Sequence, residues 1–341
     1  MSRTLFEHQR ANRRKSAALV AVFILFFAWI GFGLDLILYL QTQGAPPGAY
    51  RHIVPFAGLV TTALAAGMAW FSWRRGPKQV LWATGAWELV NPSTPAHHQL
   101  VNVVEEMAIA SGIPRPTIWV VPDEDPNAFA TGIDERKAHV AVTEGLLNTL
   151  DRDELQAVIA HEMGHVKNDD VKLMTLLAAL VGVLALISEG TWRFMRYGGG
   201  RRGRGGGGSG KGKGGGALVA ILLVVWVISV VLAPIVSRLL ALGVSRKREF
   251  LADAMAAQFT RNPQALADAL QKIEHAGAPT KAIKSGAAHL CIADPLGRSV
   301  SSRQGRLADL LGTHPPMALR IARLRQMAYQ YEKTGELPEI A

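Results

Sequence analysis

Apolar residues in this chain are gathered into four blocks without any charged residue, at 17–34, 53–73, 173–188 and 217–237. About 20 consecutive apolar residues span the hydrocarbon core of a bilayer, whereas roughly 10 to 14 are more typical of a buried core helix. The pattern predicts membrane-spanning helices for the first, second and fourth blocks. The third block is at the short limit for a span.

The polar sequence between the second and third blocks has shorter periodicities. Leu100, Val103, Val104 and Met107 recur at helical spacing and predict a helix over 99–110. Three runs rich in strand-forming residues follow, at 117–121, 127–131 and 139–143, separated by proline, glycine and charged turns. The predicted fold class is therefore α+β and mainly helical: a multi-pass membrane protein that carries a polar domain with a small β-sheet.

This pattern predicts four parts along the chain. Residues 1–75 form an N-terminal pair of transmembrane helices, and residues 76–170 form the first part of the polar domain. Residues 171–240 form a hydrophobic hairpin with a Gly/Arg-rich loop at 198–216, and residues 241–341 form the second part of the polar domain. We interpret the first block as a retained anchor and not a signal peptide, because its apolar run is long and no small-residue cleavage site follows.

The formal net charge is +10, and much of the excess lies next to the apolar blocks. Basic residues precede the first block and follow the second, at Arg10, Arg13, Arg14, Lys15, Arg74, Arg75 and Lys78. Basic residues beside spans favour the cytoplasmic side of a lipid bilayer, which places the polar domain there. No aromatic-interleaved basic motif accompanies them, so nucleic acid is not an expected partner. The single cysteine, Cys291, excludes an internal disulfide and is predicted to be a packing residue.

The Gly/Arg-rich loop leaves two topologies open. If the third and fourth blocks form a full transmembrane hairpin, the loop lies outside, against the charge rule. A re-entrant hairpin would keep the loop inside. The length of the fourth block and the lack of charge in both blocks favour the spanning hairpin.

One helix of the polar domain carries a candidate catalytic motif. Asp151 and Glu154 form a capping-box pattern that starts this helix, and the letters HEMGH follow in it. His161 and His165 are four residues apart, so both imidazoles leave the same helix face. Two histidines at this spacing can bind one zinc ion, with Glu162 directed at a water molecule as general base. The alternative is a surface helix with two unliganded histidines, and a catalytic zinc needs a third protein ligand.

The sequence after the fourth block offers this third ligand. Glu249 and Asp253 lie on one face of a predicted helix, one turn apart. Glu249 completes a set of two histidines and one glutamate, and Asp253 can accept the second ring N–H of a ligand histidine. A solvated charged face beside a membrane is the alternative. The presence of HEMGH in the same chain favours ligation.

Four motifs in order carry a family resemblance: NAFATG from Asn127, HEMGH with the following VKNDD, SRKREFLAD from Ser245, and THPP from Thr313. Together they resemble the membrane metallopeptidases related to HtpX, of which the CAAX prenyl proteases are more distant relatives. The resemblance implies a zincin-like domain and a zinc endopeptidase of the gluzincin type with one Zn²⁺ per chain. It also implies a place in the inner, cytoplasmic membrane and a role in quality control and stress response, with unfolded or membrane proteins as substrates.

The same resemblance gives His314 as a candidate donor to the oxyanion of the transition state. A turn that leads into the helix after Pro315 and Pro316 explains the presence of His314 equally well. Asn127 could hydrogen-bond substrate backbone from a sheet edge, or simply serve the turn after Pro126. The histidines at 97, 98, 139, 275 and 289 have no ligand-like spacing and are expected on the surface or in the core.

Two other functions fit the sequence less well. A CAAX-type prenyl-protein peptidase has less support, because four membrane segments are few for an enclosed chamber. A catalytically silent metal-binding scaffold has less still, because Glu162 is present.

Overall fold

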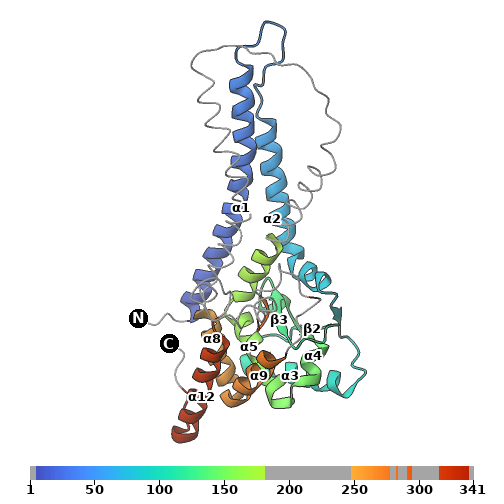
Figure 1. Cartoon of the computed structure of the whole chain (residues 1–341), viewed down its shortest axis with the longest axis vertical. Coiled ribbons are helices and arrows are strands. Elements are labelled where there is room, and N and C mark those ends of the chain that lie inside the picture. The colour runs from blue at the N-terminus through green and yellow to red at the C-terminus, as the bar shows by residue number, and fades with distance from the viewer. Residues whose placement is uncertain (1–4, 181–246, 277–281, 283–289, 294–314, 338–341) are drawn as a thin grey trace. The chain divides into compact units, whose positions relative to one another are not determined.

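The computed structural model of the chain describes residues 5–180, 247–276, 282, 290–293 and 315–337 (Figure 1). The helices are α1 (Leu5–Thr42), α2 (Phe56–Ala83), α3 (Pro95–Ser111), α4 (Glu144–Thr149), α5 (Arg152–Lys167), α8 (Lys247–Thr260), α9 (Pro263–His275) and α12 (Met317–Thr334). The strands are β1 (Trp87–Glu88), β2 (Thr117–Val121), β3 (Ala128–Gly132) and β4 (Ala138–Thr143), with a 3-10 turn at Glu135–Lys137. By their internal contacts, residues 1–16, 73–179 and 241–341 form one unit, called the sheet unit, and residues 17–72 and 180–240 form a second, called the helix-pair unit.

The described part of the helix-pair unit consists of most of α1 and α2 and their connection. Both helices are long and apolar enough to cross a membrane, as the first two apolar blocks predict. Only 11% and 22% of their most apolar windows are buried, which is unlike the core helix of a soluble protein. Asp35 of α1 caps the start of α2 by accepting hydrogen bonds from the backbone N–H groups of Ala57 (3.1 Å) and Gly58 (2.6 Å).

The third apolar block is described only up to residue 180, and its residues 173–180 are helical. The remainder of this block, the fourth block and the Gly/Arg-rich loop lie outside the described residues. The choice between a spanning and a re-entrant hairpin therefore stays a prediction.

The sheet unit is built on a four-stranded mixed sheet in the order β1-β2-β4-β3. β2 and β4 are parallel, and the β1–β2 and β3–β4 pairs are antiparallel. The predicted strand at 117–121 is confirmed with its bounds, and β3 and β4 differ from the predicted runs by one residue. β1 was not predicted, because a strand of two residues has no periodicity of its own.

Both faces of this sheet are buried. In β2, Ile118 and Val120 point into the main core, which includes apolar residues of α3, α5 and α9. Trp119 and Val121 alternate with them and join a second core with residues that follow α5 and that end α2. Cys291 lies in this second core and is 1% exposed, so its prediction as a packing residue is confirmed.

The helices that frame the site begin at strong local signals. The predicted helix at 99–110 is confirmed as α3 but begins earlier, at Pro95, because Thr94 caps it and proline suits the first helical position. α5 begins with the predicted capping box: Asp151 accepts from the N–H of Glu154 at 3.0 Å, and the Glu154 carboxylate accepts from the N–H of Asp151 at 2.9 Å. Helix α5 then packs against α3, α8, α9 and β3.

Replacing Asp151 with Ala should lower the free energy of unfolding by about 1 kcal/mol, because the first turn of α5 loses its side-chain acceptor. The measurement is the thermal unfolding temperature of the detergent-purified chain. Asp151→Ser keeps a capping oxygen and serves as the control, and equal losses in both variants would show that the cap is not the cause.

Candidate metal centre and active site

A glycine in α5 lets the two ligand-bearing helices approach closely. An added Cβ at Gly164 would lie 3.3 Å from the Cα of Ala252 and 3.4 Å from the Cβ of Met255, both in α8. The 3.3 Å approach is tighter than nine in ten real Cβ contacts. The backbone of α8 therefore passes directly over the HEMGH segment, and Glu249 at the start of α8 is brought to the two histidines.

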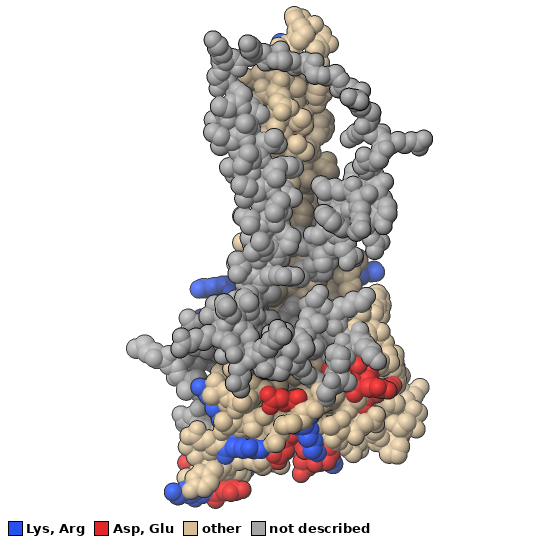
Figure 2. Space-filling view, viewed as in Figure 1, with Lys and Arg blue, Asp and Glu red and all other residues tan. Residues whose placement is uncertain are grey.

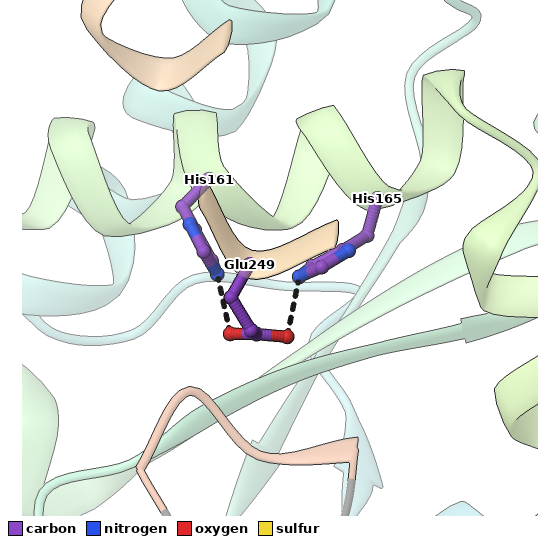
Figure 3. A group of neighbouring side chains, drawn as sticks. All are labelled: His161, His165 and Glu249. Carbon is purple, nitrogen blue, oxygen red and sulfur yellow. Dashed lines mark ion pairs between the residues drawn. The ribbon is translucent and has the colours of Figure 1, made fainter. Parts of the chain in front are cut away.

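His161, His165 and Glu249 converge as the sequence predicted (Figure 3). His161 Nε2 lies 3.7 Å from Glu249 Oε2, and His165 Nε2 lies 3.6 Å from Glu249 Oε1. The three candidate ligand atoms all lie within 4.8 Å of one another. Ligand atoms around a tetrahedral zinc ion, each about 2.0–2.2 Å from it, are roughly 3.3 to 3.6 Å apart. The two imidazoles and the carboxylate thus fit a zinc ion in type, and the two histidine–carboxylate distances of 3.7 and 3.6 Å are close to this spacing.

Asp253 takes the predicted position behind one histidine. Its Oδ1 lies 3.0 Å from His161 Nδ1, which turns Nε2 of that ring toward Glu249. Arg320 of α12 holds the same carboxylate through two donors, Nε to Oδ2 at 2.9 Å and Nη2 to Oδ1 at 2.7 Å. This arginine is fully buried, and its Nη1 also lies 3.4 Å from Glu249 Oε2. Arg320 therefore joins the orienting carboxylate to the candidate ligand.

Asp170 has the corresponding position behind His165. Its Oδ2 lies 3.2 Å from His165 Nδ1, and its side chain is 2% exposed. Arg248, which precedes Glu249 in α8, reaches its Oδ1 at 3.5 Å. Each histidine is thus oriented by its own buried aspartate, and each aspartate has an arginine from another helix nearby.

Glu162 lies beside the three candidate ligands and is buried. The residue is 1% exposed, and its Oε1 is buried without a hydrogen-bond partner among the residues that the structure describes. Burial raises the pKa of Glu162 to about 7, and the nearby Glu249 carboxylate adds to this shift. A carboxylate with a pKa near neutrality can both accept and return a proton at neutral pH.

The two histidines have opposite electrostatic surroundings. Burial lowers the pKa of His161 to about 4, with a smaller contribution from the charge on Arg320, so its ring is neutral. Burial also opposes charge on His165, but the hydrogen bond with Asp170 and the charge of Glu249 outweigh it and raise its pKa to about 9. Carboxylates around His165 thus favour positive charge at the point where the three ligand atoms meet.

Two other candidate residues have different outcomes. Asn127 is fully buried just before β3, where its Nδ2 donates to the carbonyl of Ala293 at 3.0 Å and its Oδ1 accepts from the N–H of Ala128 at 3.0 Å. Its amide is thus used within the chain, and its predicted contact with substrate stays a prediction. His314 lies outside the described residues, and its role as oxyanion donor also stays a prediction.

The outer edge of β3 is already paired at one point. Phe129 and Cys291 form an antiparallel bridge, and the N–H of Ile292 donates to the carbonyl of Ala128 at 2.9 Å. Residues 290–293 therefore cover the part of the edge next to Asn127.

Sequence reasoning missed the roles of Asp170, Arg248 and Arg320. Asp170 gave a weak local signal, because it follows His165 by five residues just after the helix end. Arg248 adjoins Glu249 in the sequence, yet a basic residue there was explained by the membrane surface. Arg320 gave no signal, since it is one of several arginines in a polar helix and only the fold brings it to Asp253.

Two histidines one turn apart on a helix, facing a glutamate from a second helix, are the ligand arrangement of zinc-dependent peptidases. The sequence model described as Peptidase family M48 matches residues 96–328, which include both helices. The chain belongs to this peptidase family.

Relatives named "Protease HtpX homolog" match nearly the whole chain. The relative from Listeria monocytogenes serotype 4b (strain CLIP80459) is 38% identical over 328 residues, which are 95% of this chain and 100% of the relative. The relative from Dictyoglomus thermophilum is 35% identical over 329 residues, with 96% and 97% covered. Among solved structures, S. mikatae Ste24p matches with 18% identity and a TM-score of 0.44, over 91% of this chain and 66% of that one.

Replacing Gly164 with Ala should weaken metal binding roughly tenfold, because α8 must move outward by a few tenths of an ångström and carry Glu249 with it. Affinity is measured by competition with a metal-binding dye. The control is Gly67→Ala in α2, the same change where an added Cβ meets nothing within 4 Å. Unchanged affinity in Gly164→Ala would show that this contact does not position Glu249.

Proposed function

We propose that the chain is a zinc-dependent endopeptidase of the inner, cytoplasmic membrane that hydrolyses peptide bonds of misfolded or damaged membrane proteins. The observation that carries the proposal is the convergence of His161, His165 and Glu249 next to the buried Glu162. Membership of the M48 family and the similarity to relatives named as HtpX proteases support the same activity.

Zinc bound to His161, His165 and Glu249 would supply a Lewis acid that lowers the pKa of water and polarises a substrate carbonyl. The neutral ring of His161 suits ligation, because a histidine must give up its proton to bind a metal. Asp253 and Asp170 fix the direction of the two rings. The protein thus supplies a rigid and buried donor set.

Glu162 is proposed as the general base and then the general acid. Its carboxylate accepts a proton from the attacking water and returns it to the amine that leaves the scissile bond. Its buried Oε1 lacks a partner among the described residues, which fits an atom that bonds water or substrate during the reaction. The raised pKa of Glu162 matches this double task.

The proposed membrane side follows from charge. Residues 17–72 contain only two charged residues, Asp35 and Arg51. On the face drawn in Figure 2, the described part of this unit is almost entirely uncharged, while acidic and basic residues gather over the sheet unit. The chain on both flanks of the helix pair is basic and belongs to the sheet unit, which favours a cytoplasmic position for that unit.

Replacing Glu162 with Gln should lower the rate of peptide cleavage by about 10²- to 10⁴-fold while leaving zinc affinity nearly unchanged, because an amide orients water but cannot accept its proton. The assay is cleavage of an unfolded model substrate, and of a membrane protein, by detergent-purified chain with and without chelator. The control is Glu105→Gln, an exposed glutamate of α3. Equal cleavage by Glu162→Gln and the unaltered chain would refute the role, and zinc binding without any cleavage would favour a silent scaffold.

A further inference from the structure

The start of α1 contacts the turn that follows α5. Gln9, Asn12 and Arg13 lie on one helix face, by their spacing of three and four residues. Gln9 Nε2 donates to the carbonyl of residue 167 at 2.8 Å, and Asn12 Nδ2 donates to that of residue 168 at 3.0 Å. Arg13 Nε pairs with the carboxylate of residue 169 at 2.8 Å. Three consecutive residues at the end of the HEMGH helix are therefore held by the N-terminal segment.

This turn is in an uncommon backbone conformation. Asp169 has a φ of 58°, in the left-handed region that residues other than glycine rarely adopt. The turn ends α5 and starts the helical residues from 170 onward, so its conformation sets where Asp170 points. Contacts from Asn12 and Arg13 stabilise this turn.

Asn12 also reaches the aspartate that orients His165. Its Nδ2 lies 2.7 Å from Asp170 Oδ1, while Asp170 Oδ2 faces His165 Nδ1 at 3.2 Å. Asn12 is 4% exposed, so this is a buried hydrogen bond to a carboxylate. Besides His165 and Asn12, the donors to Asp170 among the described residues are Asn168, at 3.1 Å, and Arg248, at the longer distance of 3.5 Å.

We propose that Asn12 is a positioning residue of the metal site and acts on His165 through Asp170. Asn12 holds one oxygen of the carboxylate, which leaves the other directed at the histidine ring. The proposal rests on the proposed function, because it takes His165 as a zinc ligand. It makes the segment before the first apolar block a working part of the peptidase and not merely a topology signal.

The proposal also couples the site to α1. The helix that carries Asn12 continues without interruption to Thr42 and contains the first candidate span. One residue of helical register corresponds to a rotation of about 100° and a rise of 1.5 Å. A shift of that size would move the amide of Asn12 away from Asp170. The proposed contact therefore depends on the helical register of the first part of α1, residues 5–16, which belongs to the same unit as Asp170.

The test compares three full-length variants in detergent. Asn12→Leu removes the amide with little change in volume, and Asn12→Ser keeps a shorter polar group. Ser16→Ala is the matched control, because Ser16 is buried on the same helix and, within the described part of the chain, its hydroxyl bonds only the carbonyl of Asn12. Zn²⁺ affinity is measured with a competing dye, and the Co²⁺ absorption spectrum reports the ligand geometry. The thermal unfolding temperature checks that each variant is folded.

We expect Asn12→Leu to bind Zn²⁺ roughly tenfold more weakly and to change the Co²⁺ spectrum, as is typical when a residue behind a metal ligand is lost. Asn12→Ser should change both in the same direction by less, and Ser16→Ala should change neither. On a soluble unfolded substrate, kcat should fall with little change in KM. If Asn12→Leu fails to fold, the affinity and spectrum of Asn12→Ser decide.

A double-mutant cycle with Asp170→Asn identifies the route. If Asn12 acts through Asp170, the double variant should bind Zn²⁺ as weakly as Asp170→Asn alone. In Asp170→Asn the carboxylate that Asn12 positions is already absent, so replacing Asn12 as well causes no further loss of affinity. Additive losses, or folded Asn12 variants with unaltered affinity and spectrum, would overturn the inference. If the unaltered chain binds Zn²⁺ and cleaves peptides in such a case, the proposed function stands and only the inference fails. If the unaltered chain binds no zinc, both fail.

Discussion

The burial of four carboxylates in one small region is the constraint on which the site depends. Glu162, Glu249, Asp170 and Asp253 are each no more than 6% exposed, and ionised groups in such a place require partners. Arg320 comes from α12, Arg248 from α8, the histidines from α5 and Asn12 from α1. Segments from both ends of the chain must therefore be in place before the site is electrostatically balanced. Removing any one partner leaves a buried charge, which costs more than a lost surface contact.

Features set by local sequence could be predicted well. β2 has the predicted bounds, because five strand-forming residues lie between Pro116 and Pro122. Helix α5 begins at its capping box, and helical spacing alone places His161 and His165 on one face. Glu249 and Asp253 were predicted as a pair one turn apart, and the structure brings both to the histidines.

Features set by packing could not be predicted in this way. The bond from Asn12 to Asp170 joins residues 158 positions apart, and no period in the sequence relates them. Arg320 resembles its neighbours Arg323 and Arg325 in sequence, but only Arg320 is buried. β1 is a strand because β2 lies beside it. Gly164 showed only as the fourth letter of the motif, although the close approach of α8 depends on its missing side chain.

The pairing of Ile292 with Ala128 occupies part of the outer edge of the sheet. An extended peptide that added to β3 at this point would have to displace residues 290–293, which already bond there, so its binding would be an exchange. The net binding free energy would be only the difference between the pairing free energy of the incoming peptide and that of the displaced segment. By this reasoning a polypeptide whose backbone hydrogen bonds are satisfied in its own fold would gain nothing from such an exchange, whereas one with unpaired backbone groups would. The same cover shields the edge from pairing with a second sheet, which limits aggregation.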